Sequence, residues 1–237
     1  VFVIAAGNDG VVQPQDIQFQ SAGLIDNMIL VGSVGPTGVI SGFSNRPGEA
    51  CITVNQACHR LMDRFLVAPG ELLLVSDGQG GYFRRSGTSF SAPLVSGAAA
   101  LLAGQWRWLE GEDIADILLE SAQDLGAPGT DPVYGRGMLD IAAAMSPLQS
   151  DQLYQLLPGG SRLYVGEMGL TPGQLSFETP GENLLTVFED TQDSFRDFQI
   201  SLDSVTSGAP TADIYLAERT LPRTSTPGNA RAADAAP

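Results

Sequence analysis

Short apolar runs alternate with small-residue or amphipathic segments along the first 147 residues. The runs at 1–6 and 28–34 are rich in Val and Ile, and each is short enough to be a buried parallel strand. Further strands are predicted at 39–43 and 72–75, and a loop or hairpin at 46–63. Helices are predicted at 89–105, 111–122 and 138–145. Because strands alternate with helices, the pattern predicts an α/β fold of three layers around a mostly parallel sheet.

Two of the predicted helices have distinct signatures. The segment 89–105 contains a run of small residues, Ser96 to Ala100, which lets a helix pack close to a sheet. Its Pro93 lies near the first turn, where a missing N–H costs little. The segment 111–122 has Glu112 and Asp113 in its first turn and apolar residues on one face, as expected of an amphipathic helix.

The composition changes after residue 147. We assign 1–147 to one domain and 148–222 to a β-leaning extension, in which polar, strand-like stretches are separated by Pro and Gly. These stretches cover 162–168, 184–189, 198–202 and 213–217. The last segment, 223–237, is rich in Thr, Pro and Ala and is expected to be disordered.

The charge of the chain excludes one class of partner. The formal net charge is −15, and all 12 basic residues are Arg. Such a surface repels phosphate backbones, so we expect no nucleic-acid partner.

No apolar run reaches the roughly 18 residues that a transmembrane helix needs. No signal peptide is visible, which says nothing about secretion in a chain that opens within a strand.

The two cysteines lie seven residues apart in a predicted surface insertion. Cys51 and Cys58 would close a short loop, which favours a disulfide formed in an oxidising compartment; two free cysteines are the alternative. Since the chain has one His and no Cys-x-x-Cys pattern, the sequence does not fit a zinc site.

The segment 86–97 carries the strongest chemical signal. Ser89 stands in a glycine-led turn immediately before the small-residue helix. The turn lifts its hydroxyl out of the backbone, and the helix N-terminus offers unpaired N–H groups to a developing oxyanion. The alternative is that Ser89 only caps the helix.

A second segment, 3–10, ends a predicted strand and places Asn8 at the carboxyl end of the sheet, where ligands bind in α/β folds. For Asn8 taken alone, the alternative is an asparagine that fixes the turn between strand and loop. Together, the segments 3–10 and 86–97 resemble the oxyanion and nucleophile segments of subtilisin-like serine proteases. Three further landmarks follow in the same order, at 43–46, 68–70 and 134–140. The resemblance covers roughly residues 1–146, the C-terminal half of a catalytic domain.

This resemblance implies a serine endopeptidase that works through an acyl-enzyme on Ser89, with Asn8 and the Ser89 N–H as the oxyanion hole. In this family the catalytic Asp and His precede the oxyanion Asn, so both are expected upstream, and the 237 residues alone are expected to be inactive. His59 follows Asn8 and lies beside Cys58, so we interpret it as a surface residue. The chemistry needs no cofactor; structural calcium is compatible with the family, but the sequence assigns no ligands for it.

The resemblance also implies a protein or peptide substrate. Asp9 lies near the family's specificity pocket, where it would favour basic or polar side chains at P1; a solvated acid is the alternative. Backbone edges for an extended substrate would come from three neighbouring residues, Ala5, Ala6 and Gly7. Phe90 stands where several relatives have an oxidisable Met.

The segment 184–202 resembles the region after the protease domain of bacterial autotransporter subtilases. The resemblance therefore implies a secreted or cell-surface protein, with membrane contact only through a translocator domain outside this chain. Two other functions are considered: a sedolisin-like peptidase, which uses an Asp where Asn8 stands, and a non-catalytic pseudo-protease or binding fragment.

Overall fold

The computed structural model describes residues 1–165, 184–192, 194–201 and 214–216. The chain divides into two compact units. Unit 1 comprises Val1–Gly104 and Leu109–Leu148, and unit 2 comprises Gln105–Trp108 and Gln149–Pro237. Within the described ranges, none of the helices combines the length and the apolar character required to cross a membrane.

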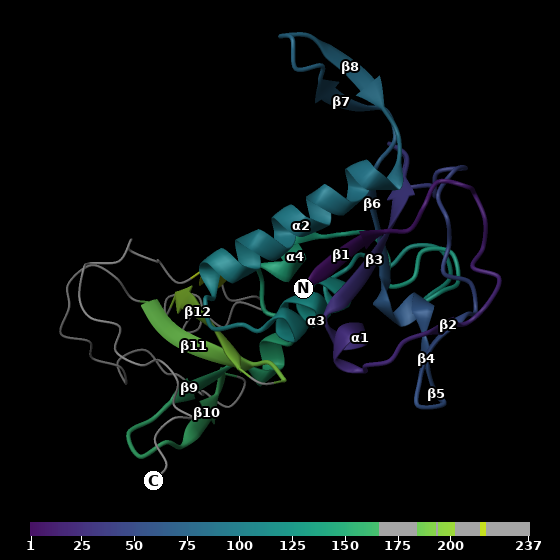
Figure 1. Ribbon diagram of the computed structural model, residues 1–237. Coiled ribbons are helices and arrows are strands. Elements are labelled where there is room, and N and C mark those ends of the chain that lie inside the picture. The colour runs from purple at the N-terminus through teal and green to yellow at the C-terminus, as the bar shows by residue number, and fades with distance from the viewer. Residues whose placement is uncertain (166–183, 193, 202–213, 217–237) are drawn as a thin grey trace. The chain divides into compact units, whose positions relative to one another are not determined.

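Unit 1 is built on a three-stranded parallel sheet (Figure 1). Its strands are β1 (Phe2–Ala5), β3 (Met28–Val34) and β6 (Phe65–Pro69), in the order β1-β3-β6. The central strand β3 pairs on both sides, and its Ile29 and Val31 have no exposed surface. The apolar run at 28–34 therefore forms the buried strand that it predicted, and the expected α/β class holds for this unit.

Helices accompany the sheet. The long helix α2 (Thr88–Gln105) buries one face that includes Val95, Ala98 and Leu102, and Pro93 falls in its second turn. Helix α3 (Gly111–Glu120) begins with a capping box between Glu110 and Asp113, which satisfies two backbone N–H groups at its start. Two one-turn helices complete the set, α1 (Gly23–Asp26) and α4 (Ile141–Ala144).

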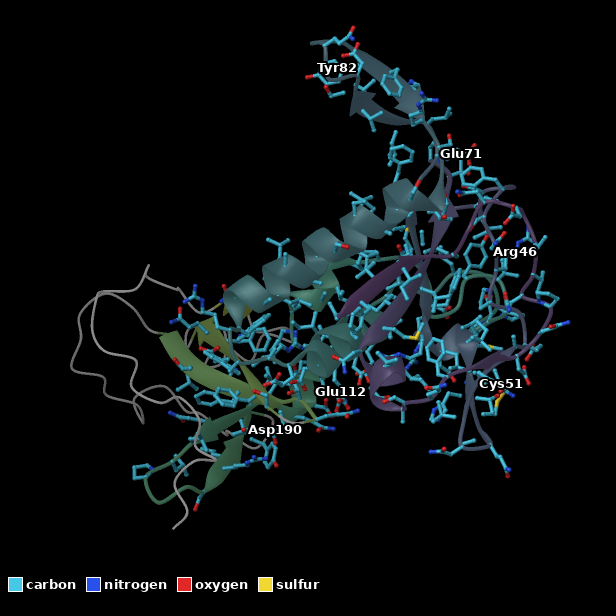
Figure 2. All side chains as sticks on the ribbon, in the orientation of Figure 1. Arg46, Cys51, Glu71, Tyr82, Glu112 and Asp190 are labelled. Carbon is cyan, nitrogen blue, oxygen red and sulfur yellow. A yellow bond between two sulfur atoms is a disulfide. The ribbon has the colours of Figure 1, made fainter. Side chains whose placement is uncertain are left out.

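The remaining elements of unit 1 are short. β2 (Ile17–Gln18) joins β4 (Cys51–Val54) and β5 (Ala57–Arg60) in a small sheet, and the 3-10 helix η1 (Leu61–Arg64) leads from β5 into β6. Cys51 and Cys58 form a disulfide across the β4–β5 hairpin (Figure 2). A separate hairpin of β7 (Leu73–Ser76) and β8 (Tyr82–Arg85) precedes α2.

Unit 2 contains an antiparallel sheet in the order β10-β9-β11-β12-β13. The 3-10 helix η2 (Ser150–Gln152) precedes it. The strands are β9 (Tyr154–Leu156), β10 (Arg162–Tyr164), β11 (Leu184–Asp190), β12 (Phe195–Ser201) and β13 (Ile214–Leu216). Four of the five strands overlap the strand-like stretches of the sequence.

The core of unit 2 includes a segment that the sequence assigned to the first domain. Trp106 is fully buried, stacks edge-on against Phe198 at 5.4 Å between ring centroids, and donates from Nε1 to Asp197 Oδ1 at 3.0 Å. The Arg196 guanidinium is fully buried, pairs with Glu189 and lies over the Trp106 ring. The buried ion pair and the aromatic rings of Trp106 and Phe198 thus form one cluster.

A second cluster of unit 2 joins β9, β10 and β11. The Tyr154 hydroxyl donates to Asp190 Oδ1 at 2.6 Å, and Arg162 pairs with the same carboxylate (Figure 2). Burial, followed by the hydrogen bond to Asp190, raises the pKa of Tyr154 to about 12. The phenol therefore stays protonated throughout the neutral range.

Two predicted elements are wrong. The segment 39–43 forms only an isolated bridge from Ile40 to Val34, because the chain turns back there and the Ser41 N–H bonds to Ser33 O. The helix expected at 138–145 is confined to Ile141–Ala144, because the Met138 backbone pairs with Gln123 instead. The segment 223–237 lies outside the described residues.

The buried ion pair of unit 2 yields a stability prediction. Arg196→Met should lower the free energy of unfolding by about 3–5 kcal/mol, because it leaves the Glu189 carboxylate buried without its partner. Urea denaturation measures this loss. The double variant Glu189→Leu/Arg196→Met should recover most of it, and Arg60→Met at the exposed pair with Asp63 should have a much smaller effect. A double variant as unstable as the single one would contradict the prediction.

Candidate active site

The candidate site lies at the carboxyl end of the parallel sheet, where α/β folds bind their ligands. The loop after β1 carries Asn8, and the first turn of α2 carries Ser89, just after Gly87. Gly70, immediately after β6, ties this turn to the sheet: the Gly87 N–H donates to Gly70 O at 2.8 Å, and the Gly70 N–H donates to Val34 O at 3.2 Å. The topology thus brings Asn8 and Ser89, 81 positions apart, to one edge of the sheet.

Thr88 joins the two segments, and it has no exposed surface. Its backbone N–H donates to Asn8 Oδ1 at 2.8 Å, and its hydroxyl donates to the same oxygen at 3.1 Å. The Gly7 N–H donates in turn to Thr88 Oγ1 at 3.2 Å. These three bonds hold the loop after β1 against the first turn of α2.

The contacts from Thr88 fix the orientation of the Asn8 amide. A backbone N–H can only donate, so the atom that faces Thr88 N must be the Asn8 oxygen and not its nitrogen. The Nδ2 group therefore points away from Thr88. None of the described residues provides it with a hydrogen-bond acceptor, so both of its N–H groups are available to a ligand.

Ser89 is the second residue of α2 and is exposed. A Cβ placed on Gly87 would lie 3.2 Å from Ser89 Oγ and 3.6 Å from Asn8 Oδ1, so both side chains converge on this glycine. The Ser89 backbone N–H is among the first four of the helix, which have no intrahelical acceptor. The site thus combines a hydroxyl, a side-chain amide donor and a backbone donor, the set needed to attack a carbonyl carbon and to hold its oxygen.

The other predicted binding residues occupy the loop after β1. The N–H groups of Ala6 and Gly7 are already bonded, to Val31 O and Thr88 Oγ1 respectively. Because Ala6 directs its N–H group toward β3, Ala5 directs its backbone groups toward the opposite edge of β1. Asp9 is exposed. Of the three predicted backbone contacts, Ala5 is therefore the residue whose backbone groups do not face β3.

His59 lies away from this edge of the sheet. It belongs to β5, which precedes η1 and the amino end of β6, whereas the site follows the carboxyl end of β6 (Figure 1). His59 is exposed and pairs across the hairpin with Ile52. It does not belong to the constellation of Asn8 and Ser89.

Sequence reasoning missed two residues of the site. Thr88 was within the nucleophile segment, but only its buried contacts show that it orients Asn8. Asn45 was part of a family landmark without a role, and it hydrogen-bonds to the loop that carries Asn8. Within the described parts of the chain, no group of three or more His, Cys, Asp or Glu side chains could hold a metal ion.

Comparisons with known proteins identify relatives of this chain. Residues 1–137, more than half of the chain, match the model of the Subtilase family. The autotransporter lipoprotein NalP of Neisseria meningitidis is 48% identical over 61 residues, which are 26% of this chain and 6% of NalP. The halolysin-like extracellular serine protease Nep of Natrialba magadii is 27% identical over 223 residues, 91% of this chain and 38% of Nep. The chain spans under two fifths of either relative.

Among solved structures, the self-cleaved protease domain of PatA matches 62% of this chain and 49% of its own, with 28% sequence identity and a TM-score of 0.44.

The Thr88 contacts yield a matched pair of variants. Thr88→Val keeps the shape of the side chain but removes the hydroxyl, so the Gly7 N–H loses its acceptor and Asn8 Oδ1 loses a donor. We expect the free energy of unfolding to fall by about 1–3 kcal/mol. Thr88→Ser keeps the hydroxyl and should lose less. If urea denaturation gives the larger loss for Ser, then packing of the methyl group, and not hydrogen bonding, is what Thr88 contributes.

Proposed function

The chain belongs to the subtilase family, and from that membership we propose that it forms part of a serine-type endopeptidase with Ser89 as its nucleophile. The observation that carries this proposal is the arrangement around Thr88. Its two bonds turn the Asn8 amide nitrogen away from the helix, and the next residue presents an exposed hydroxyl at the helix N-terminus.

The proposed chemistry follows from these groups. Ser89 Oγ attacks the scissile carbonyl carbon while its proton passes to a base, and the carbonyl π electrons move to the oxygen. Asn8 Nδ2 and the Ser89 N–H hold that oxyanion. Collapse of the intermediate re-forms the carbonyl and expels the amine, which takes the proton from the base. Water then hydrolyses the acyl-enzyme by the same sequence of steps.

The base lies outside these 237 residues. His59 is the single His of the sequence, and it precedes the amino end of β6. We therefore propose that the catalytic His and Asp are supplied by residues upstream of Asn8, as the family order implies, and that the 237-residue chain alone does not cleave peptides. No cofactor is invoked for the chemistry.

Substrate and location are part of the same proposal. Ala5 directs its backbone groups away from β3, which is compatible with an extended peptide that pairs with the backbone there, with Asp9 close to its P1 side chain. Similarity to an autotransporter lipoprotein and to an extracellular protease supports secretion or display at the cell surface. Contact with a membrane would come through a translocator domain outside this chain.

A fluorophosphonate probe tests the nucleophile. The probe transfers its phosphonyl group to an activated serine oxygen and releases fluoride. We expect Ser89 to be labelled in the product of the complete gene and to remain unlabelled in the 237-residue chain, with the adduct located by mass spectrometry. Ser89→Ala should abolish labelling, whereas Ser91→Ala, at a buried hydroxyl bonded to Ala68 O, should not.

The opposite results identify the alternative function. If the complete gene product folds but is not labelled at Ser89, then the fold is kept without the chemistry, and the protein is a non-catalytic binding module. Labelling at another serine would assign the nucleophile elsewhere and contradict the role proposed for the first turn of α2.

Phe90 yields a second prediction for the active protein. It is half-buried and directly follows the nucleophile. A Met there would be converted by peroxide into a polar sulfoxide next to the reacting atoms, which Phe does not permit. We therefore expect Phe90→Met to lose peptidase activity in peroxide faster than the parent. The native methionines, five of which lie in these 237 residues, are common to both proteins, so equal rates of loss would contradict the prediction.

A further inference from the structure

The Asn45 side chain forms hydrogen bonds to the loop that carries Asn8. The Asn45 Oδ1 atom accepts from the N–H groups of Asp9 at 3.0 Å and Val11 at 3.2 Å, and Asn45 Nδ2 donates to Ala6 O at 3.1 Å. The Asn45 backbone N–H also donates to Gly7 O at 3.1 Å. These four bonds lie on both sides of Asn8 in the sequence.

The backbone of this loop at Gly7 leaves room for the Asn45 side chain. Gly7 has a φ of +104°, a conformation that L side chains rarely adopt. A Cβ at this position would also collide with Asn45 Nδ2. Gly7 therefore serves two needs, because it permits the turn and leaves room for the Asn45 amide.

Asn45 is itself anchored to the buried sheet. Ser44, which precedes it, has no exposed surface; its Oγ accepts from the Ser33 N–H at 2.9 Å and donates to Asn45 O at 3.0 Å. Ser33 belongs to the central strand β3. A continuous hydrogen-bonded path thus runs from β3 through Ser44 and Asn45 to the backbone on each side of Asn8.

Two residues therefore have separate tasks at the proposed oxyanion site. Thr88 fixes the direction of the Asn8 amide group, and Asn45 fixes the backbone from which that amide projects. We propose that Asn45 is a positioning residue, which acts on the reaction through the loop at 6–11 and touches neither the substrate nor the reacting atoms. This inference rests on the proposed function.

The inference has a kinetic signature. Substrate binding draws on contacts along the whole peptide, whereas the oxyanion forms only in the transition state. Displacement of Asn8 should therefore lower kcat and leave KM almost unchanged. A residue that supported only the stability of the fold would lower the melting temperature without that selective effect on kcat.

A double-mutant cycle in the complete gene product tests the inference. Asn8→Ala should lower kcat about 10²- to 10³-fold, the range known for loss of one oxyanion donor in subtilisin. Asn45→Ala should lower kcat about 10- to 100-fold, since small displacements of reacting groups have effects of this size. In the Asn8→Ala background, Asn45→Ala should cause a further loss of no more than about 2-fold, because the residue through which it acts is already gone.

The controls separate positioning from folding. Asn27→Ala removes another half-buried Asn of unit 1, whose Nδ2 donates to Gly23 O, and should leave kcat unchanged. Melting temperatures of all variants monitor the fold. If Asn45→Ala does not fold, Asn45→Ser takes its place in the cycle, because it keeps a polar group at a half-buried position but cannot bridge Ala6, Asp9 and Val11.

Each outcome has one meaning. A loss in kcat that is equally large with and without Asn8 overturns the inference, as does Ser89-dependent activity that Asn45→Ala leaves unchanged. In both of these cases the proposed function stands. Peptidase activity that survives Ser89→Ala overturns the proposed function and this inference with it.

Discussion

Thr88 is the point at which two distant parts of the chain become one site. It is fully buried, and its backbone N–H and its hydroxyl both donate to Asn8, 80 positions earlier in the sequence. Without these bonds, the loop after β1 and the first turn of α2 would lie at the same edge of the sheet, but no side-chain contact would fix the direction of the Asn8 amide. The direction of the Asn8 amide, and hence the character of the site, depends on them.

The parallel sheet determines where the loop after β1 and the first turn of α2 come into contact. Strands β1, β3 and β6 are parallel, so their carboxyl ends lie at one edge, and the chain leaves each of them with a polar or glycine-rich loop. Gly70, which follows β6, is hydrogen-bonded to Gly87 next to Ser89. Ser44, which is bonded to β3, is hydrogen-bonded to Asn45. The site is thus supported from β6 on one side and from β3 on the other.

The sequence predicted the elements that depend on local pattern. The apolar run at 28–34 is β3 at the predicted bounds, and the helices at 89–105 and 111–122 begin within one residue of the predicted positions. The sequence-based prediction failed where contacts between distant parts of the chain determine the local structure. Met138 pairs with Gln123 and so shortens a predicted helix, and Trp106 joins the core of unit 2 although it directly follows a helix of unit 1.

The same division holds for the site. The sequence could propose Ser89 and Asn8 as site residues because each lies in a short motif with its own chemistry. The contributions of Thr88 and Asn45 could not be predicted, because their hydrogen bonds cross 80 and 39 positions of sequence and leave no periodic signal. Glycines gave a partial indication: a Cβ at Gly7 would collide with Asn45 Nδ2, and a Cβ at Gly87 would lie 3.6 Å from Asn8 Oδ1.

Anchorage of the loop after β1 on two sides has a consequence for the energetics of the proposed reaction. Solvent dipoles around an oxyanion in water must reorient as the charge develops, and this reorganisation is a large part of the uncatalysed barrier. Amide dipoles held by a buried threonine and a buried strand are oriented before any substrate arrives. The entropy of alignment is thus lost once, when the chain folds, and need not be lost again in each catalytic cycle.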